Sequence, residues 1–268
     1  MDNITETFPI FQFDHEPSYA ELWDKCVYLL YDIEAFKTDL EGLYQKIGIN
    51  RESRIIDVAA GAGFPSLDLM KSGYDITCTD GADDMIELFK RKASAAGITR
   101  ECRKALWLEL AQTVGQEQFD LLMCRGNSFI YADGGWNKHE MPDQERAIRS
   151  YTATLRAFHD RLRSGGWVHL DKFKDGEIGH RVKVSEIKVN ENPTEDLVFW
   201  TQRDTVAKVR QAAMIRETEG RQQSVPNITY DLLGSELEQM MSEVGFVDIQ
   251  KISLPSEKIF DIWIGRKA

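Results

Sequence analysis

The chain has 268 residues, of which 44 are acidic and 33 basic, giving a formal net charge of -11. An acidic chain is poorly suited to a large contact with a phosphate backbone, which needs clustered Lys and Arg. The sequence also contains no run approaching the roughly 20 apolar residues of a membrane helix. We therefore expect neither a nucleic-acid nor a membrane partner.

The cysteines and the N-terminal residues bear on the cellular compartment. The four cysteines include no C-x-x-C pair, and two of them lie within apolar runs, where a free cysteine packs as a small hydrophobic residue. Residues 1–13 are acidic and lack the basic and apolar regions of a signal peptide. These features predict structural cysteines, no metal site and a cytoplasmic protein.

The predicted elements begin with two helices and continue as alternating strands and helices. Apolar residues recur at helical spacing over residues 19–30 and 36–47, and Gly48 ends the second run. Strands are predicted at 54–59, 74–80, 100–103, 119–124 and 167–173, with helices at 65–73, 83–96 and 143–162 between them. Gly165 and Gly166 are expected to form the turn into the fifth strand.

The pattern changes between residues 177 and 230. Clean alternation at 182–189 and in parts of 197–209 and 212–218 predicts antiparallel strands. A helix at 234–244 and two strands at 246–254 and 259–265 are expected to follow.

This order predicts an α/β fold with a doubly wound, mostly parallel seven-stranded sheet. We expect three parts: an N-terminal helical lid (1–48), an α/β core (49–176 and 231–268) and an antiparallel insertion that covers the substrate (177–230).

The strongest local signal is the glycine-containing segment from Asp57 to Ser66, at the end of the first strand. Gly61 and Gly63 allow a tight turn and a close approach of a ligand to the backbone. A dinucleotide-binding loop would carry Gly or Ala where Ser66 stands, and Asp57 would repel a pyrophosphate. An acidic residue here suits a cofactor that bears an ammonium and a sulfonium group, which is S-adenosylmethionine (SAM).

Asp80 ends the second strand, where a carboxylate can accept both hydroxyl groups of a ribose. The alternative is that Asp80 only caps the helix that begins near Asp83.

With these residues, the sequence resembles the class I SAM-dependent methyltransferases and, within them, the glycine and sarcosine N-methyltransferases. The resemblance rests on the segments 57–63, 105–108 and above all 124–129, and it includes the N-terminal helical segment and the antiparallel insertion. It implies that Ala59 and Gly61 line the methionine part of SAM, that Asp80 holds the ribose and that Trp107 stacks near the adenine. The alternative for Trp107 is that it packs as an ordinary core residue and does not contact the adenine. The predicted cofactor site also includes Asp57, Gly63, Gly81, Met85, Leu106, Cys124, Trp23 and Tyr28.

The resemblance further implies that Asn127 directs its side-chain amide at the methyl acceptor. An Asn carbonyl can take an amine N–H while the nitrogen lone pair stays free to attack; a plain turn residue is the alternative. Asp171 and His15 are candidates to relay the amine proton. Further acceptor-binding candidates are Tyr19, His139, Trp200 and Tyr230. The aromatic residues near the N-terminus either hold a cation or pack a helix onto the sheet, and His169 is expected to be a core histidine.

The sequence departs from these relatives at two positions. They place an arginine after the fifth strand to grip the substrate carboxylate. Here Lys172 and Lys174 are the candidates to bind the substrate as point charges in its place, and neither offers a bidentate fork. Their N-terminal arginine for the SAM carboxylate is also missing, and Arg125 is a hypothetical substitute.

The predicted function is therefore SAM-dependent N-methylation of a small amine, a glycine-like, guanidino or other acceptor, with S-adenosylhomocysteine as the second product. A monomer or small homo-oligomer is expected. An O- or S-methyltransferase, a nucleotide-dependent oxidoreductase and a non-catalytic SAM-binding regulator remain alternatives.

Overall fold

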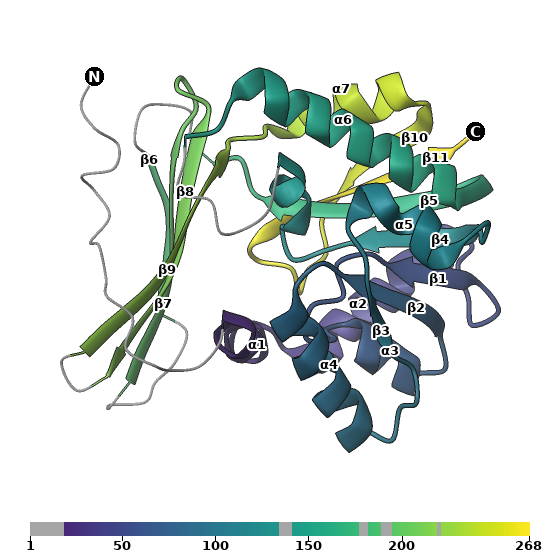
Figure 1. Ribbon diagram of the computed structural model, residues 1–268, viewed down its shortest axis with the longest axis horizontal. Helices are drawn as coiled ribbons and strands as arrows, with labels where there is room; N and C mark the ends of the chain where they lie inside the picture. The colour runs from purple at the N-terminus through teal and green to yellow at the C-terminus, as the bar shows by residue number, and fades with distance from the viewer. Residues whose placement is uncertain (1–18, 134–140, 177–181, 189–194, 219–220) are drawn as a thin grey trace.

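The computed structural model describes residues 19–133, 141–176, 182–188, 195–218 and 221–268 (Figure 1). Eleven strands form two sheets within these ranges. The larger sheet has the strand order β10-β11-β5-β4-β1-β2-β3, and the smaller one has the order β6-β7-β8-β9.

The first half of the larger sheet is parallel, and its strands lie in the order β4-β1-β2-β3. Strand β1 pairs in parallel with both β2 and β4. All six residues of β4 are buried, as expected for a central strand covered on both faces. The elements of this half are α1 (Tyr19–Leu30), α2 (Ile33–Lys46), β1 (Arg54–Asp57), α3 (Ser66–Lys71), β2 (Asp75–Asp80), α4 (Asp83–Ala95), β3 (Cys102–Lys104), the 3-10 helix η2 (Trp107–Glu109), α5 (Leu110–Val114) and β4 (Phe119–Cys124).

The second half adds one parallel strand and an antiparallel pair. Strand β5 pairs in parallel with β4, while β11 pairs in the antiparallel sense with both β5 and β10. The elements are the 3-10 helix η3 (Ser128–Asp133), α6 (Gln144–Arg161), β5 (Leu162–Phe173), α7 (Gly234–Val244), β10 (Phe246–Ile252) and β11 (Phe260–Lys267).

Apolar clusters cover both faces of the larger sheet. On one face, residues of α6 and α7 such as Tyr151, Phe158 and Leu237 pack against the strands. On the other face, residues of α2, α3 and α4 such as Phe36, Leu67 and Phe89 do so. The doubly wound, mostly parallel fold predicted from the sequence is thereby confirmed.

Two local predictions were wrong. The fifth strand begins at Leu162 rather than Trp167, because the chain pairs with Phe119 before the pairing shifts register next to Gly165, whose φ is 78°. The fourth strand of the smaller sheet, β9, has no counterpart among the predicted strands. It contains Pro226 and lies at the edge of its sheet, where a proline removes no ladder hydrogen bond.

The smaller sheet comprises β6 (Val182–Lys188), β7 (Glu195–Asp204), β8 (Val209–Thr218) and β9 (Arg221–Tyr230). It stands beside the core, and α1 lies between the two (Figure 1). Helix α1 contacts both neighbours: Cys26 packs against Met214 of β8, and Glu21 pairs with Arg91 of α4. The smaller sheet and α1 together form one side of the region above the carboxyl ends of the parallel strands.

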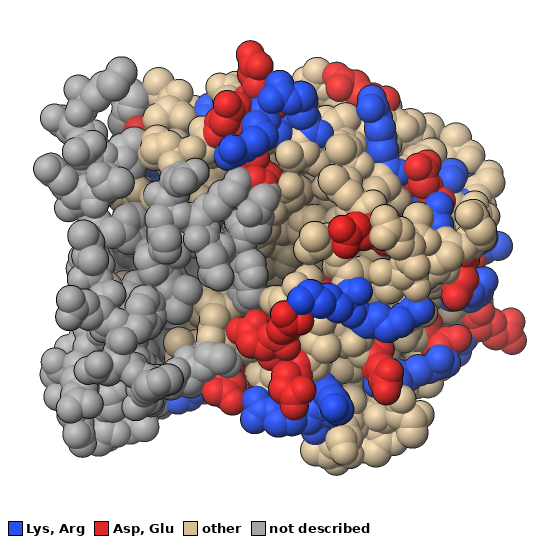
Figure 2. Space-filling model, in the orientation of Figure 1, with Lys and Arg blue, Asp and Glu red and all other residues tan. Residues whose placement is uncertain are grey.

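The described surface is of mixed charge. On the face shown in Figure 2, basic and acidic side chains are interspersed over the core. No helix in the described ranges is both long enough and apolar enough to cross a membrane.

Candidate active site

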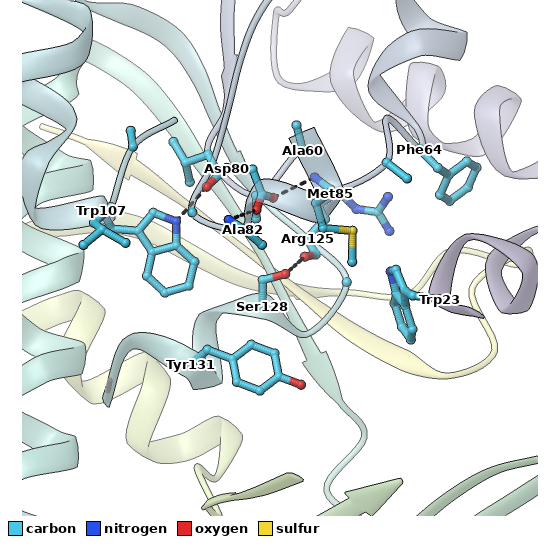
Figure 3. Close-up of a pocket in the computed structure, with 18 of the residues that line it drawn as sticks. Trp23, Ala60, Phe64, Asp80, Ala82, Met85, Trp107, Arg125, Ser128 and Tyr131 are labelled. Carbon is cyan, nitrogen blue, oxygen red and sulfur yellow. Dashed lines mark hydrogen bonds between the residues drawn. The ribbon is translucent and has the colours of Figure 1, made fainter. Parts of the chain in front are cut away.

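A cavity of about 570 Å³ opens at the carboxyl ends of β1, β2 and β4 (Figure 3). This volume lies within the range of small-molecule and cofactor sites. Its wall includes residues of the glycine-containing loop after β1, of the loops after β2, β3 and β4, and of α1. Open α/β sheets bind their ligands at this edge, outside the carboxyl ends of the strands.

Asp80 joins two of these loops at the cavity wall. Its carboxylate accepts the backbone N–H of Gly61 at 2.8 Å and that of Ala82 at 2.9 Å. Burial raises the pKa of Asp80, and the backbone donors oppose this shift. The hydrogen bond to Ala82 ends at the residue before α4, and α4 has no side-chain N-cap bond, so Asp80 does not cap this helix. Each oxygen keeps a lone pair that a ribose hydroxyl can use.

Asp57 lies behind the glycine-containing loop rather than in the cavity wall. Its carboxylate accepts the Ser66 hydroxyl at 2.5 Å and the Ala59 N–H at 3.1 Å. Burial raises its pKa to about 6 despite these donors. Ser66, the residue that departs from the dinucleotide pattern, therefore holds Asp57 in place, and Asp57 shapes the loop.

Trp107 forms the wall on the side of β3. Its indole N–H donates to the Val58 carbonyl at 2.7 Å, and its ring meets Phe158 edge-on, with the centroids 5.8 Å apart. Gly81, Met85 and Leu106 also line the cavity. The indole is thus anchored on one side and presented to the cavity on the other.

Arg125 lies buried in the wall between two carboxylates. Its Nη2 is 3.1 Å from Asp171 Oδ2 and 3.6 Å from Glu257 Oε2, and Tyr31 donates its hydroxyl to Glu257 at 2.9 Å. Burial disfavours its charged form, yet Asp171, Tyr31 and Glu257 hold the pKa of Arg125 above its ordinary value. Its Nε has no hydrogen-bond partner among the described residues. Glu257 was not predicted, because nothing near it in the chain marks it as part of a site.

Asn127 stands at the start of η3 with a φ of 59°, a value that Asn tolerates better than most residues. Its side-chain oxygen accepts the Phe173 N–H at 3.0 Å, and its own N–H donates to Asp171 at 2.7 Å. Asn127 therefore ties the loop after β4 to the end of β5. It also lines a second cavity, of about 30 Å³.

This second cavity adjoins the first. Tyr19, Trp23, Gly126 and Tyr131 line both, and the insertion completes the second with Ala212, Ala213, Met214 and Asn227. The hydroxyl groups of Tyr19 and Tyr131 hydrogen-bond to each other, and burial raises the pKa of Tyr131 to about 12. Figure 3 shows Tyr131 across the cavity from Met85. Tyr131 was not predicted, although it follows the 124–129 segment directly.

Several predicted residues lie away from both cavities. Lys172 donates to the Phe173 carbonyl and to Asp175, and burial lowers its pKa to about 8. Lys174 donates to the Lys258 carbonyl. Because neighbouring residues of a strand point to opposite faces, the end of β5 cannot direct all its side chains at one site.

The remaining predicted residues divide into two groups. Those with structural surroundings are Gly63, packed against Leu67; Cys124, in the core; Tyr28, 43% exposed beside Lys92; His169, buried against Tyr44; and Tyr230, bonded to Glu236. The others lie outside the description: His15, His139 and the side chain of Trp200.

Residues 55–166 match the family model of a methyltransferase domain. Glycine N-methyltransferase of Oryctolagus cuniculus is 28% identical over 144 residues, which are 51% of this chain and 45% of that protein. Glycine/sarcosine N-methyltransferase of Parasynechococcus marenigrum is 26% identical over 165 residues, 58% of this chain and 55% of that protein. The chain thus matches about half the length of these curated relatives. The sequence match is shorter than the resemblance inferred from the motifs, which included the N-terminal helical segment and the antiparallel insertion.

The structural likeness extends further than the sequence match. A SAM-dependent methyltransferase from Clostridium acetobutylicum superposes with a TM-score of 0.70 at 12% identity, over 93% of this chain and 98% of that one. DesVI of Streptomyces venezuelae has a TM-score of 0.69 at 16% identity, over 95% and 100%. The domain match, the homologues and the shared fold together support a class I SAM-dependent methyltransferase.

Proposed function

We propose that this protein transfers the methyl group of SAM to the nitrogen of a small-molecule amine. The observation that carries the proposal is the junction of the two cavities, where Tyr19, Trp23, Gly126 and Tyr131 serve both. A methyl donor bound in the larger cavity would meet its acceptor at this junction. The names of the curated relatives, glycine and glycine/sarcosine N-methyltransferases, support nitrogen as the acceptor atom.

The residues of the larger cavity fit SAM. Asp80 offers free lone pairs for the ribose hydroxyls, and the loop around Gly61 brings backbone close to the ligand. Arg125 contributes a buried guanidinium with an unpartnered Nε at the end where the carboxylate of SAM would lie. When bound, SAM supplies an activated methyl group whose sulfonium carries the leaving electron pair, so the protein's task is alignment and exclusion of water.

Tyr19 and Tyr131 are suited to orient the amine rather than to deprotonate it. Because burial raises the pKa of both hydroxyls, Tyr131 to about 12, they stay protonated near neutral pH. Each can accept an amine N–H and direct the nitrogen lone pair along the line of displacement. Asp171 is paired with Arg125 and Asn127, so we assign it the positioning of these two residues instead of the proton relay considered above.

The test is release of S-adenosylhomocysteine from SAM with a panel of amines, guanidino compounds, phenols and thiols. We expect turnover with amines alone, and a Tyr131→Phe variant that binds SAM normally but has a kcat/KM reduced about 10-fold to 100-fold, since orientation of the nucleophile is lost. Turnover with phenols or thiols alone would replace N-methylation by O- or S-methylation. Tight SAM binding without any turnover would favour a regulatory role.

A further inference from the structure

Aromatic side chains from α1, η3, β5 and β11 converge where the two cavities meet. Tyr19 and Trp23 of α1 and Tyr131 of η3 line both cavities, and Figure 3 shows Trp23 and Tyr131 in the wall of the larger one. Phe173, at the end of β5, lines the smaller cavity, and Phe260, at the start of β11, lines the larger one. The rings of Phe173 and Phe260 pack against each other with their centroids 5.0 Å apart. The junction therefore offers aromatic surface from both the N-terminal helix and the sheet.

These rings are held in place by one apolar cluster. Phe173 and Phe260 belong to it together with Met214 of β8, and Tyr19 and Trp23 pack against it. Met214 is buried and lines the smaller cavity. A thioether fills irregular space beside rings and makes favourable contacts with them. Because this wall is packed before any acceptor arrives, little has to be reordered when a flat, apolar group binds to it.

The volumes of the two cavities decide where such a group fits. The smaller cavity, at about 30 Å³, has room for about two water molecules and cannot hold a ring. The larger cavity, at about 570 Å³, has the size of a cofactor or small-molecule site. A ring would therefore lie in the larger cavity against Trp23 and Tyr131, and only a small substituent would reach the smaller one.

The charged side chains in the described wall of the larger cavity are engaged elsewhere. Asp24 pairs with a lysine of α4, and Arg125 pairs with Asp171. Asp80 accepts two backbone N–H groups and is assigned above to the ribose. Glu109 is exposed. The aromatic part of the wall is thus the surface that is left for the acceptor.

The polar groups at the junction favour an uncharged nitrogen. The described side chains that line the smaller cavity are all uncharged. The hydroxyl groups of Tyr19 and Tyr131 stay protonated near neutral pH, because burial raises the pKa of both. Bringing an ammonium group against such a wall costs free energy unless a counterion pairs with it. An amine on an aromatic ring is unprotonated at neutral pH, since its lone pair is delocalised into the ring, and it needs no base before it attacks.

We propose that the acceptor is an aromatic amine, with its nitrogen attached directly to a ring that packs against Trp23 and Tyr131. This inference deepens the N-methylation proposed above and rests on it. Aromatic rings pack offset or edge-to-face at centroid distances of about 4.5–7 Å, so a planar acceptor gains contacts that a glycine-sized amine does not. The nitrogen lone pair forms the new N–CH3 bond while the S–CH3 bond breaks and leaves its electron pair on sulfur. The methylated nitrogen, then cationic, releases a proton to water.

The first experiment compares acceptors with and without an aromatic ring. Release of S-adenosylhomocysteine is measured at neutral pH with aniline, 4-methylaniline and 5-aminoindole, and with cyclohexylamine and glycine as non-aromatic amines. We expect at least one aromatic amine to exceed both non-aromatic amines about 10-fold in kcat/KM. A preference for glycine or cyclohexylamine would overturn the aromatic acceptor and leave N-methylation in place.

The second experiment separates ring contact from protonation and needs no turnover. Binding of aniline and of cyclohexanol, an uncharged ring without aromaticity, is followed by calorimetry on the protein loaded with S-adenosylhomocysteine. We expect aniline to bind about 3-fold to 10-fold more tightly than cyclohexanol. Tyr131→Phe keeps the ring and should keep this preference, whereas Tyr131→Leu should lose most of it. Trp23→Leu removes the other ring and takes the place of Tyr131→Leu if that variant does not fold.

Tyr28→Leu is the matched control. Tyr28 also lies on α1, but it is 43% exposed and does not line either cavity, so the preference for aniline should persist. If aniline and cyclohexanol bind alike, or if Tyr28→Leu and Tyr131→Leu have equal effects, the aromatic acceptor is refuted even when other amines are methylated. If aniline binds selectively but no amine is methylated, the aromatic site stands and the proposed N-methylation fails.

Discussion

At the residue scale, Asp80 has two roles. Comparing its substitution with that of a nearby exposed aspartate separates these roles from a simple loss of charge. It ties the glycine-containing loop to the loop before α4 and lines the larger cavity. We expect Asp80→Asn to raise the SAM dissociation constant about 10-fold to 100-fold, because charge-assisted hydrogen bonds to ribose and backbone are lost. Calorimetric titration with SAM measures the effect.

The control for this prediction is Asp83→Asn. Asp83 is exposed, pairs with Lys104 at 2.6 Å and does not line the cavity. An exposed pair contributes little, so SAM affinity should stay within about 2-fold of the wild type. Equal effects of the two variants would contradict a ligand role for Asp80.

Asp57 should make stability fall as pH rises. Burial raises its folded-state pKa from 3.8 to about 6, so the folded chain binds this proton more tightly than the unfolded chain. The stabilisation is complete below about pH 4 and is lost as pH rises through about 6, by about 3 kcal/mol in total. Urea unfolding of the wild type and Asp57→Asn at pH 5 and pH 7 measures the effect. The variant should gain relative to the wild type at the higher pH, and a difference independent of pH would refute the assignment.

At the scale of an element, the loop from β1 to α3 depends on Gly63. Its φ of 105° is unfavourable for any other residue, and an added Cβ would clash with Leu67 and approach Phe89 at 3.2 Å. We expect Gly63→Ala to lower the free energy of unfolding by about 1–3 kcal/mol and to weaken SAM binding, because the loop must shift.

Gly42→Ala is the matched control for this substitution. Gly42 lies within α2, and no atom lies within 4 Å of an added Cβ. Alanine should raise the free energy of unfolding by about 0.5–1 kcal/mol. The two variants should thus move the thermal midpoint in opposite directions; a loss of similar size in both would contradict the assignment of the Gly63 effect to its backbone conformation and close contacts.

At the scale of the whole molecule, Asp231 links the insertion to the core. It pairs with Arg203 and Arg210 from two strands of the smaller sheet and precedes α7 of the larger domain. Asp231→Asn leaves two buried guanidinium groups without a counterion, so we expect a loss of about 3–5 kcal/mol in the free energy of unfolding. Urea denaturation of the full chain measures it. Asp248→Asn, which breaks an exposed pair with Arg266, should cost under about 1 kcal/mol.

The sequence by itself determined the order of elements and the glycine-containing loop, because both are encoded locally. Periodicities of 2 and 3.6 residues distinguish strands from helices within a few turns of chain. The bounds of β4 and α7 were predicted to the residue, since β4 is apolar except for Asp120 and Gly245 ends α7 in the left-handed conformation. The loop around Gly61 and Asp80 was recognisable because close backbone approach and an acidic strand end require particular residue types.

The tertiary structure decided which side chains meet. Glu257 joins Arg125 across more than 100 residues, and Arg203 faces Arg210 only through the register of β7 and β8. Lys172, expected to contact the substrate, instead turns toward Asp175. Strand order, register and the face on which a residue falls are set by packing between distant segments, and a shift of one residue reverses every side chain. Local pattern carries no record of these choices, which is why the glycine-containing loop was predictable and the lining of the second cavity was not.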